Sequence, residues 1–155
     1  MKIKILIADD YKMMRDDLCS LLERQTNMTV VGEAENGLKA IQMAQKLQPD
    51  VIVMDIRMPE LNGIEATRQI LADLPKTKII ALSVYSDKRY VSGMIKAGAC
   101  GYLLKKSVFD ELVDAIETIV NRQKNEHPVI SKTLKTVYST YFQNINIPAA
   151  APQPT

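Results

Sequence analysis

The sequence contains no tryptophan and only two cysteines in 155 residues. Cys19 and Cys100 are too few for a disulfide framework and match no metal-ligand spacing, which is typical of chains from a reducing compartment. We therefore expect a cytoplasmic protein in which both cysteines are small buried hydrophobic side chains.

Long apolar stretches are also missing. A membrane-spanning helix needs about 18 to 20 mostly apolar residues, whereas the longest run near the start, Ile3–Ala8, leads directly into Asp9 and Asp10. The sequence thus predicts neither a membrane span nor a signal peptide.

A large excess of charge of one sign is absent as well. Residues 1–120 carry 16 Lys and Arg against 17 Asp and Glu, and residues 121–155 carry 4 against 1. Nucleic-acid binding normally requires clustered basic side chains. The basic end of the chain is therefore too weakly charged to predict DNA binding by itself.

The sequence does contain a regular succession of short apolar runs rich in Ile, Val and Leu. Their residues are mostly continuous and do not alternate with polar ones, which is typical of strands covered by helices on both faces. The predicted strands are Ile3–Ala8, Met28–Glu33, Val51–Met54, Lys78–Leu82 and Gly101–Leu104.

Segments with helical spacing of apolar residues separate and follow these runs. The predicted helices are Lys12–Gln25, Leu38–Leu47, Asn62–Leu74, Asp87–Ala97 and Val108–Val120, with Ser107 as a candidate N-cap of the last. Alternating strands and helices predict an α/β domain, a flavodoxin-like doubly wound (βα)5 fold with a five-stranded parallel sheet. In such a fold the functional site lies at the carboxyl ends of the strands.

The pattern breaks after residue 123, so residues 1–123 form the predicted domain. We interpret residues 124–147 as a linker with an amphipathic helix over Ser131–Ile145, and residues 148–155 as a disordered tail with three prolines and no charge. The helix has six large apolar side chains. It either folds back on the domain or forms a dimer or partner interface.

Polar residues close four of the five predicted strands. Asp9 and Asp10 follow the first, Asp55 the third, Ser83 ends the fourth and Lys105 follows the fifth. Carboxylates brought together repel one another and need a cation. An all-oxygen set of this size predicts Mg²⁺, with Lys105 as a second positive charge.

This combination is suited to phosphoryl transfer, because a metal ion, an ammonium group and a hydroxyl would surround one carboxylate. Asp55 is the candidate nucleophile, since it stands alone at its strand end. Any one of these residues could simply be a polar strand end or a helix cap. Four strand ends together make that interpretation much weaker.

These residues lie in motifs that resemble the receiver domain of bacterial two-component response regulators. The resemblance covers residues 1 to about 123, and the motifs that carry it are Leu6–Asp10, Val53–Pro59 with Asn62 and Gly63, Ala81–Ser83, Gly98 with Ala99, and Gly101–Lys105. It implies a phospho-acceptor, not an enzyme with turnover, whose Asp55 receives a phosphoryl group from a sensor histidine kinase.

The resemblance also implies the role of each site residue. Mg²⁺ would be held by Asp10, by Asp55 and by the backbone carbonyl of Arg57, with Asp9 acting through water. Lys105 and Ser83 would contact the phosphoryl oxygens.

Phosphorylation would draw Ser83 inward and let Tyr102 rotate into the space, which is the switch that the resemblance implies. From the sequence alone, Tyr102 is equally well explained as a half-buried aromatic side chain with no switching role. Two features depart from the family pattern. Lys106 stands where proline is common, so we expect no cis peptide bond there. Arg57 and Tyr85 flank the site and would hinder an attacking water molecule, which predicts slow self-dephosphorylation.

The sequence most resembles the NarL/FixJ subfamily, in which a linker leads to a helix-turn-helix DNA-binding domain. No such domain follows here, so DNA would be bound only through a domain absent from these residues, with the phosphorylated form a homodimer. The alternative is a stand-alone receiver that regulates a protein partner through its C-terminal helix.

Two other classes fit less well. A haloacid-dehalogenase phosphatase expects Asp-x-Asp after its first strand, and a flavin carrier needs a phosphate-binding loop there in place of Asp9 and Asp10.

Overall fold

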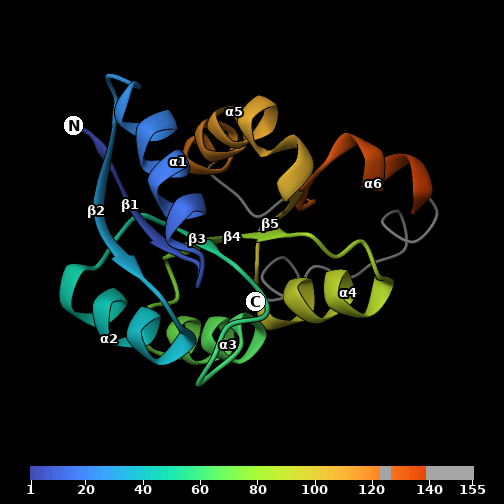
Figure 1. The fold of residues 1–155 in the computed structure, drawn as a ribbon, viewed down its shortest axis with the longest axis horizontal. Coiled ribbons are helices and arrows are strands. Elements are labelled where there is room, and N and C mark those ends of the chain that lie inside the picture. Colours follow the sequence, from blue (N-terminus) through green and yellow to red (C-terminus); the bar gives the residue numbers. More distant parts are fainter. Residues whose placement is uncertain (123–126, 139–155) are drawn as a thin grey trace.

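The computed structural model describes residues 1–122 and 127–138, which form a parallel sheet with helices on both faces (Figure 1). The strands are β1 (Ile3–Ala8), β2 (Met28–Ala34), β3 (Val51–Met54), β4 (Lys78–Ser83), β5 (Gly101–Leu104) and β6 (Val129–Ile130). The helices are α1 (Lys12–Glu23), α2 (Gly37–Leu47), α3 (Gly63–Asp73), α4 (Lys88–Ala97), the short 3₁₀ turn η1 (Lys105–Ser107), α5 (Val108–Asn121) and α6 (Lys132–Val137).

The strand order explains where a site can form. The sheet runs β2-β1-β3-β4-β5-β6, and every neighbouring pair is parallel. The chain moves from β1 to β2 on one side and then to β3 on the other, so the direction of winding reverses between β1 and β3. Helix connections diverge at such a point and leave a crevice at the carboxyl ends of the strands. The predicted doubly wound class is therefore confirmed.

Two apolar layers hold the helices on the sheet. Helices α1 and α5 cover one face, where Ile5 and Ile7 of β1 point, and α2, α3 and α4 cover the other, where Leu6 points (Figure 1). Because side chains of a strand alternate between faces, both sets must be apolar. This double burial is the reason the strands appear in the sequence as continuous apolar runs.

The prediction of five strands was one too few. Val129 and Ile130, within the predicted linker, form β6 and pair in parallel with Gly101 and Tyr102 of β5. A strand of two residues is too short to produce a periodic pattern, and therefore no sequence signal separated it from the linker. With β6 in place, β5 is not an edge strand of the described sheet, and its backbone groups have partners on both sides.

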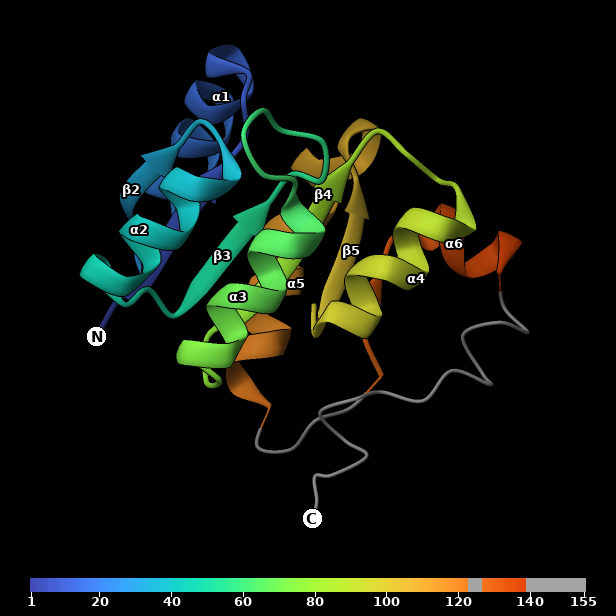
Figure 2. The ribbon, with the colours of Figure 1, turned by 90° about the horizontal axis from the view of Figure 1, so that it is seen from below.

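The described part of the C-terminal helix folds back on the domain. Of the predicted helix Ser131–Ile145 the structure describes α6, in which Leu134 is buried in the core and Val137 is 65% exposed, and Tyr138 packs against the core. Figure 2 shows α4 and α6 at the same end of the sheet. The remainder of that helix and the predicted tail lie outside the described residues, and the division into domain, linker and tail stays a prediction.

A buried cluster of polar groups fixes β6 beside β5. The hydroxyl of Ser131 accepts a hydrogen bond from the Leu104 N–H (2.9 Å) and donates to Glu111 Oε1 (2.5 Å). Glu111 also accepts from the Ser107 hydroxyl and from the Lys132 N–H. Ser107 occupies the predicted N-cap position of α5, but its side chain makes no capping bond. Its hydroxyl donates to Glu111 instead.

Among the described residues, no helix combines the length and the apolar character that crossing a membrane requires. Both cysteines are free, and each is only partly buried, so the prediction of buried side chains holds in part.

We predict that Ser131→Ala lowers the free energy of unfolding by about 1 to 3 kcal/mol, since the Leu104 N–H loses its buried acceptor. Urea unfolding followed by circular dichroism measures this. Ser20→Ala, at an exposed position of α1, is the matched control and should change stability by less than about 0.5 kcal/mol. Equal stability of the two variants would show that the Ser131 bond contributes nothing.

Candidate functional site

Three carboxylates meet where β1 and β3 end. The strand ladder continues past the last strand residues, because the Asp9 N–H bonds the carbonyl of Ala34 and the Asp55 N–H bonds that of Ala8. These bonds place Asp9 and Asp55 side by side, at the carboxyl ends of the adjacent strands β1 and β3. Each of Asp9, Asp10 and Asp55 offers an oxygen that lies within 4.8 Å of the other two.

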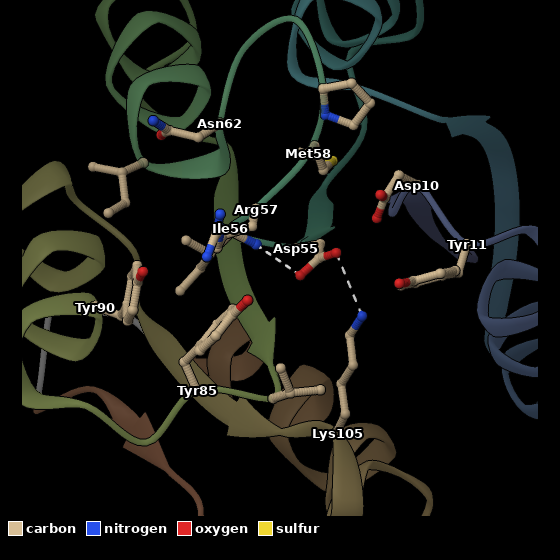
Figure 3. A pocket seen from close by; sticks show the side chains of 13 residues that line it. Asp10, Tyr11, Asp55, Ile56, Arg57, Met58, Asn62, Tyr85, Tyr90 and Lys105 are labelled. Carbon is tan, nitrogen blue, oxygen red and sulfur yellow. Dashed lines mark hydrogen bonds and ion pairs between the residues drawn. The ribbon is translucent and has the colours of Figure 1, made fainter.

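Lys105 brings a positive charge to this cluster from the end of β5. Its Nζ lies 2.8 Å from Asp9 Oδ2 and 3.4 Å from Asp55 Oδ2, and its side chain is only 10% exposed. The ammonium also lies 5.7 Å from the centre of the Tyr11 ring. Figure 3 shows Lys105 extending from β5 toward Asp55, with Asp10 and Tyr11 to the right of both. One ammonium group therefore serves two buried carboxylates.

This arrangement changes the acidity of Asp55. Burial and the nearby charge of Asp9 raise its pKa to about 7, although Lys105 and the Ile56 N–H, which donates to Asp55 Oδ1, oppose the shift. Burial also disfavours the charged form of Lys105, but its contacts with Asp9 and Asp55 outweigh this and raise its pKa. The lysine stays protonated, while Asp55 titrates near neutral pH.

The loop between β3 and α3 sets the position of Asp55. The Gly63 N–H donates to the carbonyl of Ile56 (2.6 Å), and the Asn62 side chain caps α3 by accepting from the Glu65 N–H. A Cβ atom on Gly63 would lie 1.9 Å from the carbonyl oxygen of Asp55. Only glycine permits this close approach, which explains the Asn62-Gly63 pair in the sequence.

An open pocket of about 860 Å³ lies over the carboxylates and exposes Asp55 to solutes. On one side of it stands a stack of three side chains. The Arg57 guanidinium lies 5.8 Å from the centre of the Tyr85 ring, and the rings of Tyr85 and Tyr90 are 4.7 Å apart. Figure 3 shows these three side chains together, across the pocket from Asp10. The pocket is thus acidic on one side and aromatic on the other.

Ser83 and Tyr102 both form hydrogen bonds with the backbone of Tyr85. Ser83 is fully buried and is not among the described residues that line the pocket; its hydroxyl oxygen accepts from the Tyr85 N–H (2.9 Å). Tyr102 is also fully buried, and its hydroxyl donates to the Tyr85 carbonyl (2.7 Å). Burial is the main cause that raises the pKa of Tyr102 to about 12. Tyr102 thus points inward, with its hydroxyl bound to the loop that follows Ser83.

The structure brings together most of the predicted site. Asp9, Asp10, Asp55 and Lys105 converge as expected, and Arg57 and Tyr85 flank them. Among the described residues no peptide bond is cis, which agrees with the expectation for Lys106. Sequence reasoning missed Tyr11 and Tyr90, whose contacts depend on side-chain packing and have no sequence signal.

The donor set fits a small, hard divalent cation. All its side-chain donors are carboxylate oxygens, and one of them, Asp10, is exposed at the pocket, where water can complete a coordination shell. The single ammonium of Lys105 leaves the three carboxylates with excess negative charge. This acidic pocket could therefore bind a metal ion.

Comparison with known proteins agrees with this geometry. Residues 5–117 match the family described as the response regulator receiver domain. The chain is 37% identical over 137 residues to the transcriptional regulatory protein DegU of Brevibacillus brevis, covering 88% of this chain and 58% of DegU. The chain therefore spans a little over half the length of that relative.

Solved structures give the same result. A LuxR-family two-component response regulator from Aurantimonas sp. SI85-9A1 superposes with a TM-score of 0.82 at 30% identity, covering 91% of this chain and 98% of that one. The receiver domain of the response regulator NarL from Mycobacterium tuberculosis superposes with a TM-score of 0.74 at 28% identity, covering 78% and 98%. The predicted subfamily is confirmed by these matches. With the family match over residues 5–117, they show that the chain belongs to the response regulator receiver domain family.

Proposed function

We propose that Asp55 accepts a phosphoryl group from a sensor histidine kinase, with Mg²⁺ bound at the acidic pocket. The observation that carries this proposal is the placement of Asp55 at an open pocket, between two other carboxylates and the ammonium of Lys105. A carboxylate oxygen of Asp55 attacks phosphorus, the bond from phosphorus to the imidazole nitrogen of the donor histidine breaks, and an acyl phosphate forms.

Charge decides which other groups the reaction needs. The three carboxylates carry more negative charge than Lys105 can balance, and a phosphoryl group adds about two further negative charges. Mg²⁺, when bound, neutralises this charge and polarises the phosphoryl oxygens. Asp10, Asp55 and the backbone carbonyl of Arg57 would hold the ion, and Asp9 would act through water.

Lys105 and Ser83 would contact the phosphoryl oxygens once the group is in place. Lys105 already lies 3.4 Å from Asp55. The Ser83 oxygen accepts a bond from the Tyr85 N–H, so its own proton can be donated to a phosphoryl oxygen. Tyr102, which bonds the Tyr85 carbonyl, would follow this loop and act as the switch.

The relatives of this chain suggest what the switch controls. Relatives of this chain are named transcriptional regulatory proteins and are longer than it. We propose a cytoplasmic response regulator that dimerises when phosphorylated and controls transcription through a helix-turn-helix domain. A stand-alone receiver that acts on a protein partner through its C-terminal helix is the second candidate, favoured by Val137, which α6 leaves exposed.

The proposal predicts one base-labile phosphoryl adduct per chain when the protein is incubated with Mg²⁺ and acetyl phosphate. Intact-mass spectrometry measures it. Asp55→Asn should abolish the adduct, and EDTA should suppress it. The matched control, Asp114→Asn at an exposed position of α5, should leave it unchanged.

Two outcomes would contradict this assignment. An adduct that persists in Asp55→Asn would place the modified residue elsewhere. Continuous release of phosphate with no accumulated adduct would indicate a phosphatase.

The stack of Arg57, Tyr85 and Tyr90 predicts slow self-dephosphorylation, because its bulk restricts the approach of water to the phosphorus atom. We expect the half-life of the Asp55 acyl phosphate to shorten about 3- to 10-fold when Arg57→Ala and Tyr85→Ala are combined, a barrier change of about 0.7 to 1.4 kcal/mol. Loss of adduct over time by mass spectrometry gives the half-life. An equal or longer half-life in the variant would refute this role of the stack.

A further inference from the structure

Residues 129–138, which we call the C-terminal arm, contact each of the elements that the proposed switch would move. The Ser131 N–H donates to the carbonyl of Tyr102 (3.1 Å), and the Ser131 hydroxyl accepts from the N–H of Leu104, the residue before Lys105. At the other end of the arm, the Tyr138 hydroxyl donates to the carbonyl of Ser86 (2.7 Å). Ser86 lies in the loop that follows Ser83.

The two ends of the arm are attached differently. At one end, Ser131 makes a buried hydrogen bond with the Leu104 N–H and a partly buried one with Glu111, and β6 adds its backbone bonds to β5. These contacts are made to the sheet and to α5. At the other end, the Tyr138–Ser86 bond is exposed and is made to the β4–α4 loop. Only the second attachment depends directly on the position of that loop.

The arm is also poorly able to hold its structure alone. Helix α6 has six residues, and isolated helices shorter than about 12 residues are marginal in water. Its order therefore depends on the burial of Leu134 and on the packing and hydrogen bond of Tyr138. Strengthening or weakening the attachment of Tyr138 to the loop changes the fraction of chains in which the arm is docked.

We propose that the C-terminal arm reports the phosphorylation state of Asp55, because it docks on the β4–α4 loop in the position that the phosphoryl group stabilises. This inference rests on the proposed phospho-acceptor function. In the structure the docked arm occurs together with the inward position of Tyr102 and with the loop bonded to it through Tyr85. Docking and phosphorylation thus favour the same loop position.

Thermodynamic linkage makes the coupling reciprocal. If the phosphoryl group strengthens docking, docking must strengthen the binding of a phosphoryl mimic by the same factor. Tyr138→Phe removes only the hydroxyl that reaches Ser86. One hydrogen bond of this kind changes an equilibrium by about 2- to 10-fold.

The test uses the whole chain with Mg²⁺ and beryllium fluoride as the phosphoryl mimic. Amide hydrogen exchange measures the protection of residues 129–138, and titration calorimetry measures the affinity for the mimic. We expect the mimic to slow exchange in the arm and Tyr138→Phe to weaken the affinity, each by about 2- to 10-fold. Thr136→Val is the matched control, since its hydroxyl bonds the Lys132 carbonyl within α6, and it should leave both values unchanged.

The outcomes separate this inference from the function on which it rests. If beryllium fluoride does not bind, or binds equally well to Asp55→Asn, the proposed function is wrong and the inference is wrong with it. If the mimic binds, but arm exchange is unchanged or faster, or Tyr138→Phe has the affinity of Thr136→Val, the inference alone is overturned.

Discussion

The Lys105 ammonium, held between Asp9 and Asp55, is the interaction on which the rest of the site depends. Two unit charges about 4 Å apart interact by about 4 kcal/mol at an intermediate dielectric. Asp9 and Asp55 are both buried and would repel each other by a similar amount without the lysine. Burial is the main cause of the raised pKa of Asp55, and the charge of Asp9, which the single ammonium does not fully offset, adds to it. The site is therefore acidic enough to attract a cation, and the Asp55 carboxyl remains available as the phosphoryl acceptor.

The sheet makes this arrangement possible at little structural cost. β1, β3 and β5 each end at the same edge, so residues more than 40 positions apart arrive within contact distance without a specialised loop. Gly63 adds a close approach between α3 and the Asp55 carbonyl. The same edge carries the β4–α4 loop, where Tyr85 connects Ser83 to Tyr102. Acceptor, charge partner and switch residues thus lie at one edge of the sheet.

Much of this could be predicted from the sequence, because the strands are buried on both faces and their ends carry unusual residues. Continuous apolar runs predicted five of the six strands, and the polar residues that end them predicted Asp9, Asp10, Asp55 and Lys105. What could not be predicted depends on packing. β6 is too short for a pattern. The role of Ser131 depends on its contacts with Glu111 and the Leu104 N–H, which the sequence around it does not indicate. The contact of Tyr138 with Ser86 joins residues from unrelated segments, and no local signal links them.

Burial and the neighbouring charge of Asp9 together raise the pKa of Asp55 to about 7, and a bound divalent cation would lower it. The most direct measurement is the pKa of Asp55 from carboxyl ¹³C NMR shifts, recorded with and without Mg²⁺. We expect a value of about 7 without the metal and a clearly lower value with it, because Mg²⁺ binds the ionised form. A pKa near the ordinary value of about 4 without Mg²⁺, or one that Mg²⁺ does not move, would contradict it.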